Sequence, residues 1–177
     1  VEGDFHLGLG ALANSLIIHG FRGIIWVGGR GPLPTWASAA VAAGAWQDFT
    51  AAPGVVVRFV PLATTAHFTN FKPEFMLQVW ANLGPEVRRI FYFDPDIVLK
   101  VRWSFFEEWA DYGVALVEDV NSPVPESHPR RGAWRAALAR RRKPVRRETA
   151  HYVNGGFVGL ATTQRGFLEE WREAMTL

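Results

Sequence analysis

The sequence predicts a single α/β domain with a mixed, mostly parallel sheet covered by helices on both faces. Three observations favour this fold class. Short apolar runs alternate with segments of helical spacing, which is typical of parallel crossovers. The 177 residues, 49% of them hydrophobic, are enough to bury one sizeable core. Eight Trp and thirteen Phe argue against a disordered chain, because such chains contain few aromatic residues.

The expected helices show apolar residues at the spacing of helical turns or a run rich in alanine. Leu9, Leu12 and Leu16 set this spacing in the first helix, and Gly20 ends it. Pro73 is tolerable only in the first turn of its helix. In chain order, the expected helices span 5–19, 36–49, 71–83, 104–111, 130–142 and 166–175.

The expected strands are short apolar or β-branched runs bounded by turn residues. They span 23–29, 55–60, 89–93, 113–117 and 152–160, with an extended segment over 97–101. The chain opens in a turn that leads into a helix, so we expect a trimmed domain whose first strand has been removed. No stretch resembles a linker, which indicates one domain over residues 1–177.

Composition excludes several classes of site. Without cysteine, the chain has no disulfide framework, thiol nucleophile or Cys-ligated zinc, and it fits a reducing compartment. No apolar run reaches ~18 residues, so a transmembrane helix is not expected. No signal-peptide pattern is visible at the start. These observations favour a cytoplasmic location.

Positive charge is concentrated in one segment, although the net charge of +2 is too small to predict a polyanion partner. This segment holds nine of the nineteen basic residues, namely Arg130, Arg131, Arg135, Arg140, Arg141, Arg142, Lys143, Arg146 and Arg147. Its one aromatic residue is Trp134, so the pattern does not favour nucleic-acid binding. A solvated helix face followed by a loop is the simplest interpretation, and contact with an anionic surface is the alternative.

The strongest local signal is the run Ile90-Phe91-Tyr92-Phe93-Asp94-Pro95-Asp96. An apolar strand ends here in two carboxylates, at the place where open α/β sheets bind ligands. Close carboxylates repel unless a cation compensates them, and Mg²⁺ or Mn²⁺ prefers carboxylate and phosphate oxygens. The alternative is a turn with two solvated acids.

Two further strand segments carry polar groups. The glycine pair after Asn154 interrupts an apolar strand, which indicates a bulge or a close approach of the backbone to a ligand. Asn154 offers an amide beside that opening. Asp119 follows the strand 113–117, where it would support a metal or orient a sugar hydroxyl. Three histidines near candidate loops lack partners at metal-ligand spacing, which favours structural roles for His67, His128 and His151.

Two segments that precede these strands also carry candidate site residues. Lys72 lies at the start of its helix, where the helix dipole disfavours a cation unless an anion shares the site. Residues 2–5 lead into the first helix, and Phe5 offers a stacking face there. Gly8 and Gly10 lie inside the helical pattern and lack the remaining spacing of a dinucleotide fingerprint.

Taken in order, these segments resemble nucleotide-sugar glycosyltransferases of the GT-A fold, a Rossmann-like architecture. The chain is most similar to glycosyltransferase family eight, which contains glycogenin and bacterial lipopolysaccharide galactosyltransferases. The similarity rests on the loop and helix from Gly3 to Leu16, on Lys72 before Asp94-x-Asp96, and on the segment 152–156.

The resemblance implies a role for each matching residue. Asp94 and Asp96 would bind Mn²⁺ or Mg²⁺ bridging the donor diphosphate, with Asp94 also near the ribose. A UDP-sugar is the favoured donor, and retention of anomeric configuration is the default expectation. The resemblance also implies contacts with the base and nucleotide for Gly3, Asp4 and Phe5, and with sugar or phosphate for Lys72. Asn154 and Gly155 would face the transferred sugar. Asp119 joins them as a candidate catalytic residue on its place at the strand end alone.

The chain departs from this family in three places. The Asp-Gln pair that follows the Asn-small-Gly strand and the later metal-binding His have no counterpart, and segment 121–150 matches no family motif, so we interpret it as an acceptor-recognition insertion. The acceptor, whether glycan, lipid-linked glycan or protein, is not identified. The alternatives are a phosphatase of the haloacid dehalogenase type and a non-catalytic domain that binds a sugar nucleotide or a polyanion.

Overall fold

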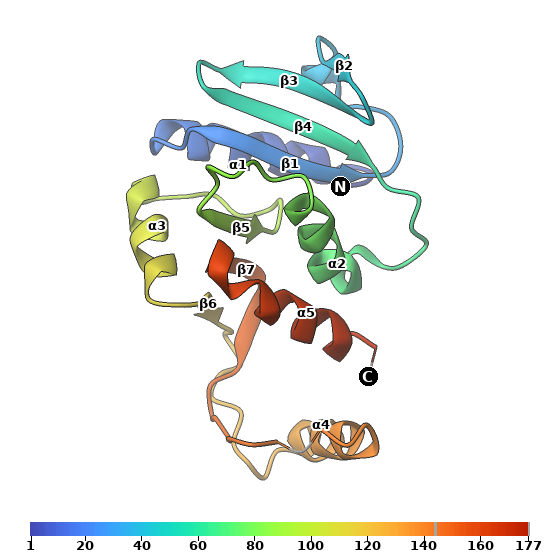
Figure 1. The fold of residues 1–177 in the computed structure, drawn as a ribbon, viewed down its shortest axis with the longest axis vertical. Helices are drawn as coiled ribbons and strands as arrows, with labels where there is room; N and C mark the ends of the chain where they lie inside the picture. The colour runs from blue at the N-terminus through green and yellow to red at the C-terminus, as the bar shows by residue number, and fades with distance from the viewer. Residues whose placement is uncertain (144, 177) are drawn as a thin grey trace.

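The computed structural model describes residues 1–143 and 145–176, which form a mixed α/β fold of five α-helices and two sheets (Figure 1). The helices are α1 (Phe5–Ile18), α2 (Phe68–Trp80), α3 (Trp103–Asp111), α4 (Pro129–Arg140) and α5 (Arg165–Ala174). The strands are β1 (Gly23–Gly29), β2 (Val41–Ala43), β3 (Trp46–Ala52), β4 (Val55–Pro61), β5 (Arg89–Phe93), β6 (Ala115–Glu118) and β7 (Val153–Ala161).

The strands form two sheets, so the expectation of one mostly parallel sheet is wrong. The first sheet has the order β1-β4-β3-β2 and the second the order β5-β7-β6. Among the described strands, β1 and β4 are the only parallel pair. In the first sheet the reason is local, because tight turns join β2, β3 and β4 and make these neighbouring strands antiparallel.

The segment 36–49, expected to be helical, contains a β-hairpin instead. A short 3-10 helix, η1 (Thr35–Ala37), precedes β2 and β3, and Gly44 in the turn between them has a φ of +70°. Trp46 of β3 packs edge-on against Trp26, with ring centroids 5.5 Å apart, and the Arg58 guanidinium lies over both rings. Such packing outweighs the helix propensity of alanine, because propensities differ by only about 1 kcal/mol or less per residue.

Helix α2 begins earlier than expected. Its N-cap is His67, whose imidazole accepts a hydrogen bond from the Thr69 amide at 3.3 Å. Pro73 therefore lies inside the helix and not in its first turn, and it is fully buried there. The earlier start escaped prediction because histidine is not one of the preferred N-cap residues.

The remaining elements lie close to their predicted positions. Strands β1 and β5 have the expected bounds, and Gly20, with a φ of +92°, follows the end of α1. A second short 3-10 helix, η2 (Thr162–Gln164), precedes α5. The segment 97–101 contains no strand in the structure, which describes it in full. Within the described residues, none of the helices combines the length and apolar character that crossing a membrane requires.

The described residues form three hydrophobic clusters, and α1 contributes to two of them. Leu9 of α1 packs against side chains of β1 and β4 in the first sheet. Leu12 and Leu16 pack against Leu99, which follows β5 of the second sheet. Helices α2 and α5 cover the second sheet around Leu160, which is fully buried. The helix that opens the chain thereby positions the segment directly after β5.

Among the described strands, none pairs with β1 along the edge away from β4. Val1 lies beside this edge: its amino group donates to the Gly28 carbonyl, and the Arg30 amide donates to the Val1 carbonyl at 3.1 Å. Val1 thus bonds to the residues directly before and after Gly29, which is the hydrogen-bond pattern of a parallel bridge between Val1 and Gly29. The start of the chain therefore runs in the same direction as β1.

Candidate functional site

The end of β5 delivers Asp94 to the surface, as the sequence predicts. The Asp94 amide donates to the Gly156 carbonyl at 2.7 Å and so extends the pairing of β5 with β7. The Asp94 side chain is 32% exposed, whereas Asp96, beyond the Pro95 turn, is an exposed residue. The two carboxylates therefore differ: one is anchored in the sheet and the other is free to turn toward a ligand.

Lys72 and Tyr92 hold the Asp94 carboxylate. The Lys72 ammonium lies 2.7 Å from Oδ1 and donates to Oδ2 at 3.0 Å, and the Tyr92 hydroxyl donates to Oδ1 at 2.6 Å. Burial, and then the hydrogen bond to Asp94, raise the pKa of Tyr92 well above its ordinary value. Tyr92 thus stays protonated and remains a donor to this carboxylate.

The sequence predicted Lys72 at the start of its helix, but the structure places it in the second turn of α2. Only 9% of its side chain is exposed. Its ammonium also donates to the Gly155 carbonyl at 3.0 Å. Lys72 is therefore a buried, paired side chain and not a solvated one. Asp94 is the anion that pairs with Lys72. Through its contacts with Asp94 and Gly155, Lys72 connects α2 to the end of β5 and to β7.

The glycine pair of β7 lies in a bulge, which is one of the two alternatives that the sequence predicts. Strand β6 loses register with β7 between Leu116 and Val117, so the pair lies in a bulge. A Cβ at Gly156 would lie 2.7 Å from Asn154 Oδ1 and 3.0 Å from Asp94 Oδ2. Only glycine lets these two side chains approach the backbone of Gly156.

Asp119 joins the same site from the end of β6. It accepts hydrogen bonds from the Asn154 amide at 3.0 Å, through Oδ2, and from the Asn121 backbone and side chain, through Oδ1. The Asn121 contacts, followed by the one from Asn154, lower the pKa of Asp119 below its usual range. Asn154 Oδ1 in turn accepts from the Gly156 amide at 2.6 Å. Asp119 therefore orients the Asn154 amide.

The N-terminal segment lies next to the Asp94 turn. A Cβ at Gly8 in α1 would lie only 2.5 Å from the Pro95 carbonyl oxygen, so helix and turn are in close contact. Before the helix, Gly3 has a φ of +53°, and Phe5 at the helix start is 57% exposed. The Phe5 ring is thus available for stacking, and Asp4 stands at the N-cap position without a side-chain cap.

The histidines have structural partners, as the sequence predicts. His67 and His128 cap α2 and α4, and His151 contacts Glu118 at 3.0 Å. Within the described residues, no group of three or more His, Asp or Glu side chains is placed to hold a metal ion. Glu118, which contacts His151, therefore has a different partner from its neighbour Asp119, which accepts a hydrogen bond from Asn154.

Part of the basic segment is engaged within the protein. Arg131 is 8% exposed and bonds the carbonyls of Val124 and Thr149 and the Glu148 carboxylate. Arg135 also contacts Glu148, at 3.0 Å. The interpretation of a wholly solvated helix face is therefore wrong for Arg131. The loop after α4 continues these contacts, because Lys143 pairs with acidic residues of α5.

Asp94 and Asp96 are the two carboxylates at the exit of β5 that a divalent cation would need. Hydrogen-bond donors already occupy three of the roughly four acceptor positions of the Asp94 carboxylate, which leaves one on Oδ2. The nearby Lys72 ammonium repels a bare cation. These two side chains would therefore hold Mg²⁺ or Mn²⁺ only together with oxygen atoms of a ligand.

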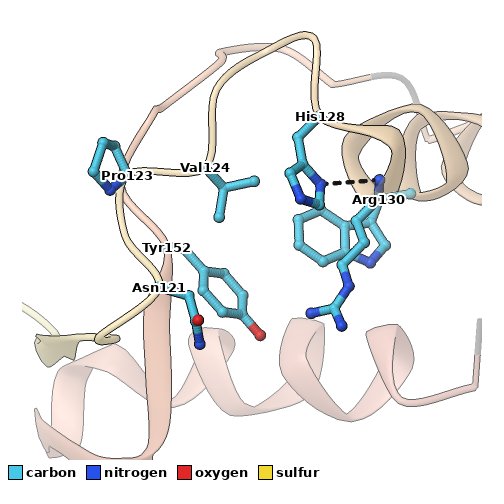
Figure 2. Close-up of a pocket in the computed structure, with 7 residues that line it drawn as sticks. Asn121, Pro123, Val124, His128, Arg130 and Tyr152 are labelled. Carbon is cyan, nitrogen blue, oxygen red and sulfur yellow. Dashed lines mark hydrogen bonds between the residues drawn. The ribbon is translucent and has the colours of Figure 1, made fainter.

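A pocket that the sequence did not predict lies beside this site, between the segment after β6, the start of α4 and Tyr152 (Figure 2). Its volume is about 510 Å³. The sequence feature that comes nearest to predicting this pocket is Trp134, the one aromatic residue in the basic segment 130–147. Its ring stacks on Tyr152, which lies far away in the chain, so the sequence did not reveal the pair.

The chain matches no protein-family model, no curated protein and no solved structure.

Proposed function

We propose that this protein transfers a sugar from a nucleotide-diphosphate sugar, with a UDP-sugar as the favoured donor, to an acceptor in a metal-dependent reaction. One observation carries the proposal. Lys72, Asp94 and the Asn154–Gly156 segment, which lie far apart in the chain, contact one another at the exit of β5. Ligands commonly bind at such strand exits in α/β proteins.

The donor diphosphate would lie against Asp94 and Asp96, which would hold Mn²⁺ or Mg²⁺ together with it. A bound cation would neutralise the charge that develops on the departing nucleoside diphosphate. Lys72 and Tyr92 keep the Asp94 carboxylate in one orientation, so little reorganisation is needed when the donor binds. Asp96 is exposed and can turn toward the ligand.

The transferred sugar would face Asn154 and Gly155. The Asn154 amide uses one hydrogen on Asp119 and one oxygen lone pair on the Gly156 amide. A side-chain amide has a second hydrogen and a second lone pair, which remain for sugar hydroxyls. Phe5, with Gly3 and Asp4 beside it, would stack on the base.

In the transfer step, the bond between the anomeric carbon and the diphosphate oxygen breaks, and the nucleoside diphosphate keeps its electron pair. A new bond forms from the anomeric carbon to the acceptor oxygen, whose proton passes to the diphosphate or to water. The transition state resembles an oxocarbenium ion, as in other glycosyl chemistry. Stabilisation of the leaving group is then the main contribution of the site.

The test is calorimetric titration of UDP and of GDP, each with and without Mn²⁺. We expect Mn²⁺ to strengthen the binding of one nucleotide and to bind weakly alone, because Lys72 opposes a bare cation. Asp96→Asn should weaken the Mn²⁺-dependent binding by at least about tenfold while the fold survives, because its side chain is exposed. Asp94→Asn should act in the same direction.

The matched control is Glu86→Gln, which removes an exposed carboxylate in the loop before β5, at the end of the strand opposite Asp94. It should leave nucleotide binding unchanged. Unaltered affinity in both Asp variants would rule out the metal role. If neither nucleotide binds to the unaltered protein, the proposed donor site is wrong.

A further inference from the structure

The pocket beside the Asp94 site has the size and lining of a small-molecule site. Its volume of about 510 Å³ lies within the range of ligand pockets in proteins. The lining combines apolar and aromatic side chains with a few polar groups, contributed chiefly by Asn121, Val124, His128, Arg130, Trp134 and Tyr152. Figure 2 shows the polar ends of Asn121, Arg130 and Tyr152 pointing into the same space.

Two aromatic rings form one part of the lining. Trp134 and Tyr152 have ring centroids 5.8 Å apart and an interplanar angle of 23°, and Trp134 is 42% exposed. Indole and phenol faces carry negative potential and attract the slightly positive C–H groups of a sugar ring. A pyranose can therefore lie against the exposed part of this pair.

The charged groups of the lining are basic. Within the described residues, the Arg130 guanidinium makes no ion pair or side-chain hydrogen bond, unlike Arg131 and Arg135. His128 accepts a hydrogen bond from the Arg130 amide at Nδ1, at 3.2 Å, so its Nε2 carries the proton in the neutral ring and is a donor. No acidic side chain is among the lining residues. This combination selects an anionic ligand.

The pocket is connected to the proposed donor site by hydrogen bonds. Asn121 lines the pocket and donates to Asp119 at 2.7 Å, and Asp119 accepts from Asn154 at 3.0 Å. Tyr152 directly precedes β7, and its carbonyl accepts a hydrogen bond from the Asp119 amide at 2.8 Å. A sugar in the pocket would therefore lie next to the residues that face the transferred sugar.

We propose that this pocket binds the acceptor, and that the acceptor carries a pyranose with an anionic group that Arg130 recognises. The acceptor role rests on the proposed glycosyl transfer, whereas the chemical class of the ligand rests on the pocket alone. Carboxylate and phosphate groups share this chemistry, because both accept paired hydrogen bonds from a guanidinium.

The test is titration with glucuronic acid, glucose 6-phosphate and glucose, followed through the indole N–H signal of Trp134, which Trp134→Phe assigns. We expect both anionic sugars to shift the signal, and to bind about tenfold more tightly than glucose. The tighter of the two identifies the anionic group. Arg130→Ala should remove this preference for anionic sugars and leave the weak binding of glucose.

Arg140→Ala is the matched control, because Arg140 is exposed near the end of the same helix and does not line the pocket. It should leave sugar binding unchanged. Equal binding of charged and neutral sugars, equal losses in both Arg variants, or an unshifted Trp134 signal would each overturn the proposal. UDP with Mn²⁺ is titrated separately. Sugar binding without nucleotide binding would support the ligand class and overturn the acceptor role.

Discussion

Gly156 is the residue at which the candidate site tolerates no side chain. Its hypothetical Cβ would lie 2.7 Å from Asn154 Oδ1 and 3.0 Å from Asp94 Oδ2. We predict that Gly156→Ala displaces both side chains and weakens Mn²⁺-dependent nucleotide binding by at least about tenfold, since site geometry has little tolerance. It should also lower the free energy of unfolding by about 1–3 kcal/mol through overpacking. Calorimetry and urea unfolding measure the two effects.

Gly166→Ala in α5 is the control for this prediction. Among the described residues, a Cβ at Gly166 would meet no atom within 4 Å. This variant should bind the nucleotide normally and differ little in stability. If both variants bind alike, the close approach at Gly156 has no functional meaning.

Several site residues were predictable from the sequence, and their partners were not. Asp94 and Asn154 stand out because polar groups follow or interrupt apolar strands. The burial of Lys72 was not predictable, because its partners Asp94 and Gly155 are 22 and 83 positions away in the chain. Such contacts depend on which strands become neighbours. The sequence identified the residues, and the packing of α2 on the second sheet decided how Lys72 is used.

Helix α1 supports the candidate site through one close contact. Gly8 lies against the Pro95 carbonyl, where a Cβ would lie at 2.5 Å from the oxygen. Alanine normally stabilises a helix interior relative to glycine. We nevertheless predict that Gly8→Ala lowers the free energy of unfolding by about 1–3 kcal/mol and weakens nucleotide binding, because the helix or the Asp94–Asp96 turn must move.

Gly10→Ala in the same helix is the matched control. Its Cβ would have only ordinary contacts, the nearest with Trp36 Nε1 at 3.7 Å. It should raise the free energy of unfolding by about 0.5–1 kcal/mol and leave binding unchanged. Urea unfolding of both variants gives the comparison, and equal shifts would contradict the role of the Gly8 contact.

Elements with strong local signals were predicted well. Strand β5 ends where Asp94 begins, and α1 ends before Gly20, because apolar periodicity and glycine act within a few residues. The helix expected over 36–49 was wrong because tertiary contacts can outweigh the helix propensity of alanine. Contacts of Trp46 with Trp26 and Arg58, which are distant in sequence, stabilise a hairpin there.

At the scale of the whole molecule, the edge of β1 away from β4 lies beside the start of the chain. Val1 bonds to this edge in the pattern of a parallel bridge with Gly29. By the alternation of a parallel ladder, the amides of Trp26 and Gly28 also face this edge. We predict that about six β-branched residues fused ahead of Val1 pair with β1 and raise the free energy of unfolding by up to about 1 kcal/mol relative to a flexible extension.

The readout is amide hydrogen exchange together with urea unfolding. Exchange at Trp26 and Gly28 should slow in the β-branched fusion. A Gly/Ser extension of the same length is the control and should change neither measurement, because it has little tendency to form a strand. Equal exchange rates in the two fusions would show that the edge does not accept a strand.

The sequence by itself determined the α/β character, most element positions and the residues Asp94, Asp96, Asn154 and Asp119 as candidates, because these signals are local. Only the tertiary structure decided that the strands divide into two sheets, that Lys72 is buried against Asp94, and that Trp134 and Tyr152 line one pocket. Each of these depends on contacts between distant segments. Their energies arise from burial and pairing in three dimensions, which periodicity along one chain does not encode.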